Sequence, residues 1–231
     1  MTKTILIIVH SEVSTPGPIG HMLMDKGYRL DIRRPCLGEA LPPTMAAHDG
    51  AVIFGGPMSA NDADDWIARE IDWISVPLKE NKPFLGVCLG AQMLAMQMGG
   101  KVAPHPGGEV EIGYYPLRPT PAGEILGPWP GHVYHWHREG FSLPSGAEQI
   151  AIGDRFENQA FRHGTNTYGI QFHPEVTRLT MHRWTVIGAH RFVLPGAQTR
   201  QAHLDGNLVH DGPVKLWLKR FLDHWLDGQQ A

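Results

Sequence analysis

Residues 84–92 read Phe-Leu-Gly-Val-Cys-Leu-Gly-Ala-Gln, an apolar run that leads directly into a helical pattern. Cys88 stands at the junction, with Gly86 and Gly90 two residues away on either side. This G-x-nucleophile-x-G spacing is typical of a nucleophile elbow, a tight strand-to-helix turn whose neighbours must be small. The N-terminus of the following helix would favour the thiolate of Cys88. The alternative is a buried apolar cysteine without a chemical role, as most free cysteines are.

The elbow lies in a half of the chain that alternates strand and helix patterns. Strands are predicted at 5–9, 28–33, 51–54 and 84–87, and helices at 18–26, 65–79 and 89–98. This alternation predicts an α/β fold with a mainly parallel sheet flanked by helices.

The second half of the chain has a different pattern. Strands are predicted at 110–117, 149–152, 157–163 and 168–172, and helices at 177–189 and 214–226, with a loop at 118–131 and an aperiodic surface excursion at 192–211. No linker divides the sequence. We therefore expect a single domain over 1–231, with a core at about 4–190 and a C-terminal helical extension at 191–231.

Composition narrows the classes of protein to consider. With 42% hydrophobic and 19% charged residues, the chain is that of an ordinary globular protein. A net charge of −3 gives no reason to expect nucleic acid or an anionic membrane as partner. No apolar run approaches the roughly 20 residues that span a bilayer. Two cysteines, Cys36 and Cys88, cannot make a disulfide framework, so we expect a cytoplasmic protein.

A candidate base follows a later predicted strand, because residues 168–175 read Tyr-Gly-Ile-Gln-Phe-His-Pro-Glu. The strand would deliver His173 at its C-terminal end, and Glu175 could reach back to the imidazole. A cysteine nucleophile needs such a base, and the base needs a partner that fixes its tautomer. Sites in α/β folds lie beyond the C-terminal ends of parallel strands, so Cys88 and His173 are expected to meet. The alternative is a strand end that carries a histidine and a capping glutamate by chance.

Residues 86–92 and 171–175 resemble the two signature motifs of the class I, triad-type glutamine amidotransferases, and Gly55-Gly56-Pro57 resembles the oxyanion loop of that family. The resemblance spans roughly residues 4–190 and is strongest to stand-alone members labelled GMP-synthase-like. It implies a flavodoxin-like sheet flanked by helices. It also implies hydrolysis of the side-chain amide of glutamine through a γ-glutamyl thioester, with release of ammonia.

The resemblance also implies a role for each residue that matches a motif. Cys88 would be the nucleophile, His173 the base and later the acid, and Glu175 the group that orients His173. The oxyanion would be bound by the backbone N–H groups of Gly56 and Leu89, and the substrate would be held by Gln92 and His137. No cofactor is implied.

One segment departs from the family pattern. Many members carry a Ser-His-Gly type segment that binds the α-amino and carboxylate groups of glutamine, whereas residues 133–141 of this chain read Val-Tyr-His-Trp-His-Arg-Glu-Gly-Phe. The substrate is therefore open between free glutamine and a γ-glutamyl peptide or amide. His132, His135 and His137 suggest a metal site, but no carboxylate or cysteine completes a convincing zinc set, so we predict no metal.

Three functions follow from these observations. The first is a glutaminase that supplies ammonia to a separate synthetase subunit, since no G-x-x-x-x-G-K-[ST] motif for an ATP site occurs in the 231 residues. The second is a free-standing γ-glutamyl hydrolase or peptidase. The third is a catalytically silent binding module, which the intact set of Cys88, His173 and Glu175 disfavours.

Overall fold

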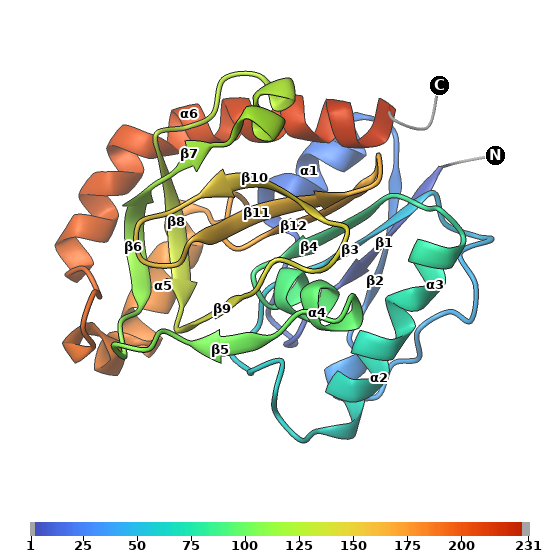
Figure 1. Cartoon of the computed structure of the whole chain (residues 1–231), viewed down its shortest axis with the longest axis horizontal. Helices are drawn as coiled ribbons and strands as arrows, with labels where there is room; N and C mark the ends of the chain where they lie inside the picture. The colour runs from blue at the N-terminus through green and yellow to red at the C-terminus, as the bar shows by residue number, and fades with distance from the viewer. Residues whose placement is uncertain (1–2, 228–231) are drawn as a thin grey trace.

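The computed structural model describes residues 3–227, which are built around an eight-stranded sheet in the order β2-β1-β3-β4-β12-β11-β10-β7 (Figure 1). The first five strands of that order run parallel: β2 (Arg29–Arg33), β1 (Thr4–Ile8), β3 (Gly50–Ile53), β4 (Phe84–Val87) and β12 (Thr167–Ile170). The antiparallel edge consists of β11 (Asn158–His163), β10 (Glu148–Ile152) and β7 (Arg118–Pro119). The predicted mainly parallel sheet is confirmed.

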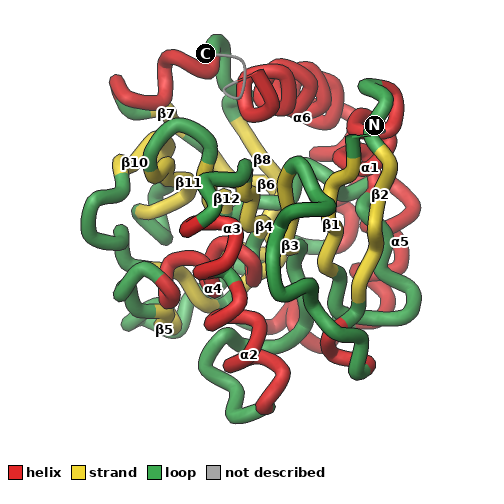
Figure 2. Tube along the Cα trace, turned by 90° about the vertical axis from the view of Figure 1, so that its right-hand side faces the viewer, coloured by secondary structure: helices red, strands yellow, loops and turns green. Residues whose placement is uncertain are grey.

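Both faces of the sheet are covered, as the alternation of β1 shows. Ile5 and Ile7 belong to one hydrophobic cluster, and Leu6 and Ile8 belong to another. The first cluster packs under α1 (Gly17–Asp25) and α6 (Arg200–Asp227). The second packs under α2 (Asp65–Trp73), α3 (Ser75–Lys79) and α4 (Leu89–Gln97). Figure 2 shows the sheet between these two layers of helices, so the predicted flanking by helices is confirmed as well.

Two small antiparallel pairs lie beside the main sheet. One joins β6 (Glu111–Pro116) to β8 (His132–His137), and the other joins β5 (Val102–Pro104) to β9 (Glu139–Phe141). The N–H of His173 donates to the carbonyl of Tyr134 at 2.8 Å. This bond connects β8 to the residues that follow β12. It therefore places the end of β8, around His137, near the C-terminal end of the parallel strands.

The predicted helix at 65–79 is two helices in the structure. α2 ends at Trp73 and α3 begins at Ser75. Pro77 explains the break, because it has no N–H to donate to the carbonyl four residues earlier and its ring crowds that carbonyl. The predicted loop at 118–131 also contains the strand β7 and a 3₁₀ helix, η2 (Pro121–Leu126).

The prediction of an aperiodic surface excursion at 192–211 is wrong from Arg200 onward, because α6 begins there and runs for 28 residues. Gly206, Gly212 and Pro213 lie inside this helix and hide its pattern in the sequence. Packing stabilises it instead, since Trp217 and Trp225 are fully buried in the core under the sheet.

The remaining helices are α5 (Arg178–Ile187) and two short 3₁₀ turns, η1 (Pro35–Leu37) and η3 (Ala189–Val193). No helix within residues 3–227 has the length and apolar character needed to cross a membrane.

Candidate active site

Cys88 sits at a strained turn between β4 and α4. Its φ of 52° and ψ of −105° are unusual, and within residues 3–227 only Asn81 shares a positive φ among non-glycine residues. Such a conformation costs on the order of 1–3 kcal/mol and persists where the surroundings enforce it. The surroundings here are tight, because a Cβ added to Gly90 would lie 2.1 Å from the carbonyl oxygen of Ile53. The first turn of α4 therefore packs against the end of β3 and holds the elbow in place.

Gly90→Ala is expected to lower the free energy of unfolding by about 3 kcal/mol, because the new methyl group collides with rigid backbone. For a chain of this size the melting temperature should fall by roughly 6–12 °C. Gly131→Ala is the matched control, since a Cβ at Gly131 meets no atom within 4 Å. Thermal melting followed by circular dichroism measures both. A Gly90→Ala protein that melts together with the control would show that the elbow is not packed as described.

His173 and Cys88 both lie next to Gly55. A Cβ added to Gly55 would lie 2.8 Å from His173 Cε1 and 3.4 Å from Cys88 Cβ. His173 Nδ1 donates to Glu175 Oε1 at 2.8 Å, and both side chains are buried. Burial alone would lower the pKa of His173, but the negative charges of Cys88 and Glu175 and the hydrogen bonds to both raise it to about 10. The imidazole therefore keeps its proton at neutral pH, ready to donate it to a leaving group.

The two residues predicted to bind the oxyanion line the same pocket as Cys88. The backbone N–H groups of Gly56 and Leu89 have no hydrogen-bond acceptor among the described residues, and both line a pocket together with Cys88. His10 holds the loop before Gly56, because its ring nitrogens lie 3.1 Å from the carbonyl oxygen of Gly55 and 2.9 Å from Glu70 Oε1. Burial opposes a charge on His10, but the neighbouring Glu70 raises its pKa. Sequence reasoning missed this buried pair.

A second pair of side chains links the thiol to the rest of the pocket. Gln171 donates to Cys88 Sγ at 3.6 Å, and Gln92 donates to Gln171 Oε1 at 3.2 Å and to the carbonyl of Glu139 at 2.8 Å. The predicted substrate-holding residue Gln92 thus uses its amide nitrogen within the protein. Gln171 received no role in the sequence analysis. A signal for it exists, because Gln171 lies two residues before His173 and alternate residues of an extended chain face the same side.

The pocket next to Cys88 has a volume of about 30 Å³ and opens to solvent. It brings together the residues that the resemblance assigned to substrate and oxyanion: Gly56, Leu89, Gln92 and His137. Three charged residues also line it, namely Arg138, Glu139 and Arg191. Arg191 was not foreseen, because it lies in a 3₁₀ turn, η3, in the part of the chain expected to extend beyond the core.

The pocket-lining His137 belongs to a buried cluster with His135 and Glu111. His137 Nε2 lies 3.0 Å from Glu111 Oε2 and 3.1 Å from His135 Nδ1, and His135 Nδ1 lies 3.4 Å from Glu111 Oε2. Burial opposes the charge on Glu111, but His135 and His137 outweigh it and lower the pKa of Glu111 to about 2. Burial also lowers the pKa of His135 to about 3.

This cluster corrects one step of the sequence reasoning. A carboxylate does complete the histidine pair, because Glu111 on β6 is the direct cross-strand partner of His137 on β8. The three facing atoms, at these separations, are a set that could hold a metal ion. Hydrogen bonds also account for them, since His137 Nδ1 lies 2.9 Å from the carbonyl oxygen of Glu139 and Gln159 donates to Glu111 Oε2 at 2.8 Å.

We therefore keep the prediction of no metal and expect dialysis against a strong chelator to change neither kcat/KM nor the melting temperature. Hydrogen bonds within the protein, rather than an ion, would then stabilise the cluster. Elemental analysis of the purified protein, with a mock-dialysed sample as control, completes the measurement. If the purified protein contained stoichiometric zinc or another transition metal, and dialysis removed the metal together with activity or stability, the prediction would be wrong. Glu111, His135 and His137 would then be assigned as the ligands of that metal.

Comparisons with known proteins agree with this geometry. A sequence model of the family described as glutamine amidotransferase class-I matches residues 17–185. YfeJ, a glutamine amidotransferase-like protein of Salmonella typhimurium, is 31% identical over 181 residues, which cover 74% of this chain and 74% of that protein. One of the subunits of the glutamine-hydrolysing GMP synthase of Methanosarcina mazei is 37% identical over 137 residues, covering 56% of this chain and 65% of that relative.

Other relatives are longer, and two solved structures match nearly the whole chain. The glutamine-hydrolysing GMP synthase of Porphyromonas gingivalis is 36% identical over 140 residues, which cover 59% of this chain but 26% of that enzyme. A glutamine amidotransferase from Methylobacillus flagellatus is 28% identical with a TM-score of 0.91, covering 99% of this chain and 95% of that one. One from Thermotoga maritima is also 28% identical, with a TM-score of 0.87 and coverages of 98% and 99%.

Proposed function

The chain belongs to the class-I glutamine amidotransferase family, and from that premise we propose that it hydrolyses the side-chain amide of glutamine with Cys88 as nucleophile. The family and the flavodoxin-like fold expected from the two motifs are confirmed. One observation supports the reaction above all others. The strained elbow at Cys88 opens onto a pocket that Gly56 and Leu89 also line, and His173, which is paired with Glu175, hydrogen-bonds to Cys88.

In the first half of the proposed reaction, Cys88 Sγ attacks the γ-carbonyl carbon of glutamine and a C–S bond forms. The carbonyl oxygen takes the negative charge and accepts hydrogen bonds from the N–H groups of Gly56 and Leu89. His173 then donates its proton to the amide nitrogen, the C–N bond breaks, and ammonia leaves. The product at this stage is a γ-glutamyl thioester on Cys88.

In the second half, water attacks the thioester carbonyl while His173 takes a proton from it. The C–S bond breaks, glutamate leaves, and the sulfur of Cys88 is released as a thiolate beside His173, which again carries the proton. Glu175 acts through His173 in both halves, because its contact with Nδ1 keeps Nε2 directed toward the reaction. No cofactor takes part in this sequence.

We propose that the ammonia goes to a separate synthetase. Support comes from the relatives, since the M. mazei protein is by name one of the subunits of a GMP synthase. A cytoplasmic location suits this role, and both Cys36 and Cys88 are free thiols. A free-standing γ-glutamyl hydrolase is the second candidate. It is favoured by the departure from the family pattern at Trp136-His137-Arg138, which lines the pocket.

Purified protein assayed alone separates the two candidates. We expect ammonia release from L-glutamine and little cleavage of γ-glutamyl dipeptides at equal concentration. Robust dipeptide cleavage without glutamine turnover would reject the amidotransferase proposal and support the γ-glutamyl hydrolase instead. Binding of glutamine without turnover of either substrate, in the presence of candidate synthetases as well, would leave only a silent binding module.

A further inference from the structure

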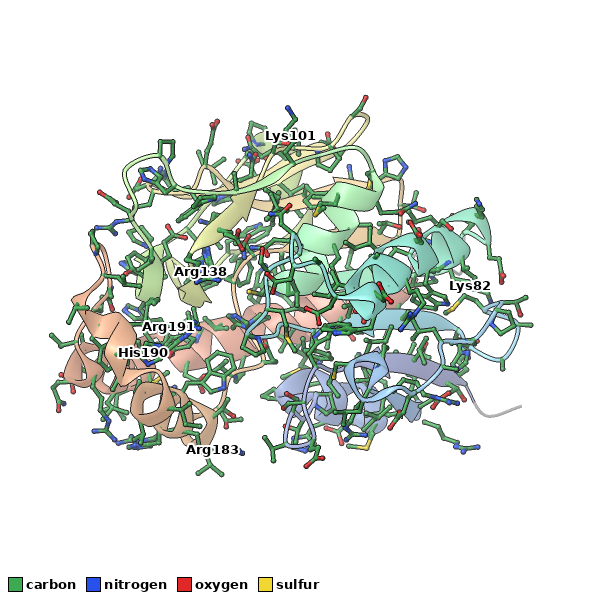
Figure 3. The ribbon with its side chains drawn as sticks, turned by 90° about the horizontal axis from the view of Figure 1, so that it is seen from below. Lys82, Lys101, Arg138, Arg183, His190 and Arg191 are labelled. Carbon is green, nitrogen blue, oxygen red and sulfur yellow. The ribbon has the colours of Figure 1, made fainter. Side chains whose placement is uncertain are left out.

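Two arginines from distant parts of the chain meet at the rim of the Cys88 pocket. Arg138 follows β8, and Arg191 lies in η3 after α5. Both line the pocket, and in Figure 3 they lie next to each other, with His190 beside them and Lys82 and Lys101 elsewhere on the molecule. Two positively charged side chains, Arg138 and Arg191, therefore belong to this pocket.

Neither arginine has an acidic partner among the described residues. The ion pairs found there do not include Arg138 or Arg191, although arginines elsewhere pair with carboxylates, as Arg155 does with Glu109 at 2.7 Å. Partial burial, and then the charge of Arg138, lower the pKa of Arg191. Two like charges held together without a counter-ion destabilise one another, and a bound anion would relieve this repulsion.

Glu139 adds a negative charge to the same rim. Glu139 lines the pocket, no ion pair of the described residues includes its carboxylate, and its carbonyl oxygen accepts hydrogen bonds from Gln92 and His137. These bonds fix the backbone beside Arg138. The rim thus offers two guanidinium groups and one carboxylate, which complements the carboxylate and ammonium groups at the α-carbon of an amino acid.

We propose that Arg138 and Arg191 bind the α-carboxylate of the substrate while Glu139 faces its α-ammonium group. This inference rests on the proposed function, since it assumes a γ-glutamyl substrate whose amide reaches Cys88. It assigns the recognition of the substrate's α-carbon to residues outside the two family motifs. It also explains how the chain recognises this end of the substrate with a Trp-His-Arg segment in place of Ser-His-Gly.

The test uses binding rather than turnover, so that it does not depend on the chemistry. Calorimetry on the Cys88→Ala protein compares L-glutamine with L-glutamine α-amide, which lacks the α-carboxylate. Arg191→Gln should weaken glutamine binding about ten- to hundredfold, the range for hydrogen bonds to a charged group. Arg138→Gln should weaken it less, because Arg138 is more exposed. Neither change should alter binding of the α-amide by more than about twofold.

Arg183→Gln is the matched control, because Arg183 on α5 is an exposed arginine outside the pocket and its loss removes the same charge. It should leave both affinities unchanged. With the native cysteine, the two rim variants should raise KM for glutamine and leave kcat within a few-fold, which a merely structural role would not do.

Three results would overturn the inference: unchanged glutamine affinity in both rim variants, equal losses for glutamine and its α-amide, or no binding of glutamine to the Cys88→Ala protein. Failure of the proposed function would be seen separately. In that case the native protein releases no ammonia from glutamine, yet the discrimination between the two ligands still depends on Arg138 and Arg191.

Discussion

Cys88→Ala is expected to abolish glutamine hydrolysis, with kcat reduced by about a million-fold, as loss of the nucleophile reduces it in other triad enzymes. The oxyanion donors and the imidazole of His173 remain, but no other group at the pocket can form the thioester. A coupled assay of ammonia release measures the loss. The variant must be shown to be folded by circular dichroism and thermal melting.

Cys36→Ala is the matched control for this experiment. Cys36 is the only other cysteine, and it lies half-buried in η1. Burial, and then the charge of Glu70, raise the pKa of its thiol, so it stays protonated and weakly nucleophilic at neutral pH. The control should keep wild-type kcat. A folded Cys88→Ala protein with kcat within a hundredfold of wild type would contradict the assignment of the nucleophile.

Glu175→Gln should lower kcat substantially, by between about tenfold and 10⁴-fold, and leave KM for glutamine nearly unchanged. The upper bound is the cost of a wrong tautomer in a serine triad. Glutamine can present its amide nitrogen to His173 Nδ1, which would move the imidazole proton to the wrong side. The loss should stay below that bound, because a cysteine depends less on a strong base than a serine does. KM should hold, because Glu175 is not among the residues that line the pocket.

Glu124→Gln, at an exposed position in η2, controls for the loss of one negative charge. Steady-state kinetics on both folded variants gives the comparison. If Glu175→Gln retained wild-type kcat, Cys88 and His173 would act as a dyad, and Glu175 would only stabilise the end of the strand.

The local features of the fold and site could be predicted because short stretches of sequence determine them. Buried parallel strands are apolar on both faces, so β1 and β4 stand out as continuous runs. The elbow needs glycine at a fixed distance from Cys88, since Gly90 touches the backbone of β3. His173 and Glu175 are two residues apart, and their contact follows from that spacing.

Features that depend on contacts between distant segments could not be predicted in the same way. Glu111 meets His137 because β6 and β8 pair in one particular register, and nothing local to either strand specifies that register. Arg191 reaches the pocket because η3 packs against β8 and α6, where the ring of Phe192 contacts Trp136 and His203. The first half of α6 was missed because its glycines and its proline contradict helix propensity, and tertiary packing overrides propensity there.

The central claim is that Cys88 is the group that reacts with the γ-carbonyl of glutamine. Brief treatment of the native protein with a glutamine-mimicking electrophile, followed by peptide mapping in a mass spectrometer, tests it most directly. The account predicts one adduct per chain on the peptide that contains Cys88, slowed by added L-glutamine, with Cys36 unmodified. Preferential modification of Cys36, or labelling of Cys88 that glutamine does not slow, would contradict it.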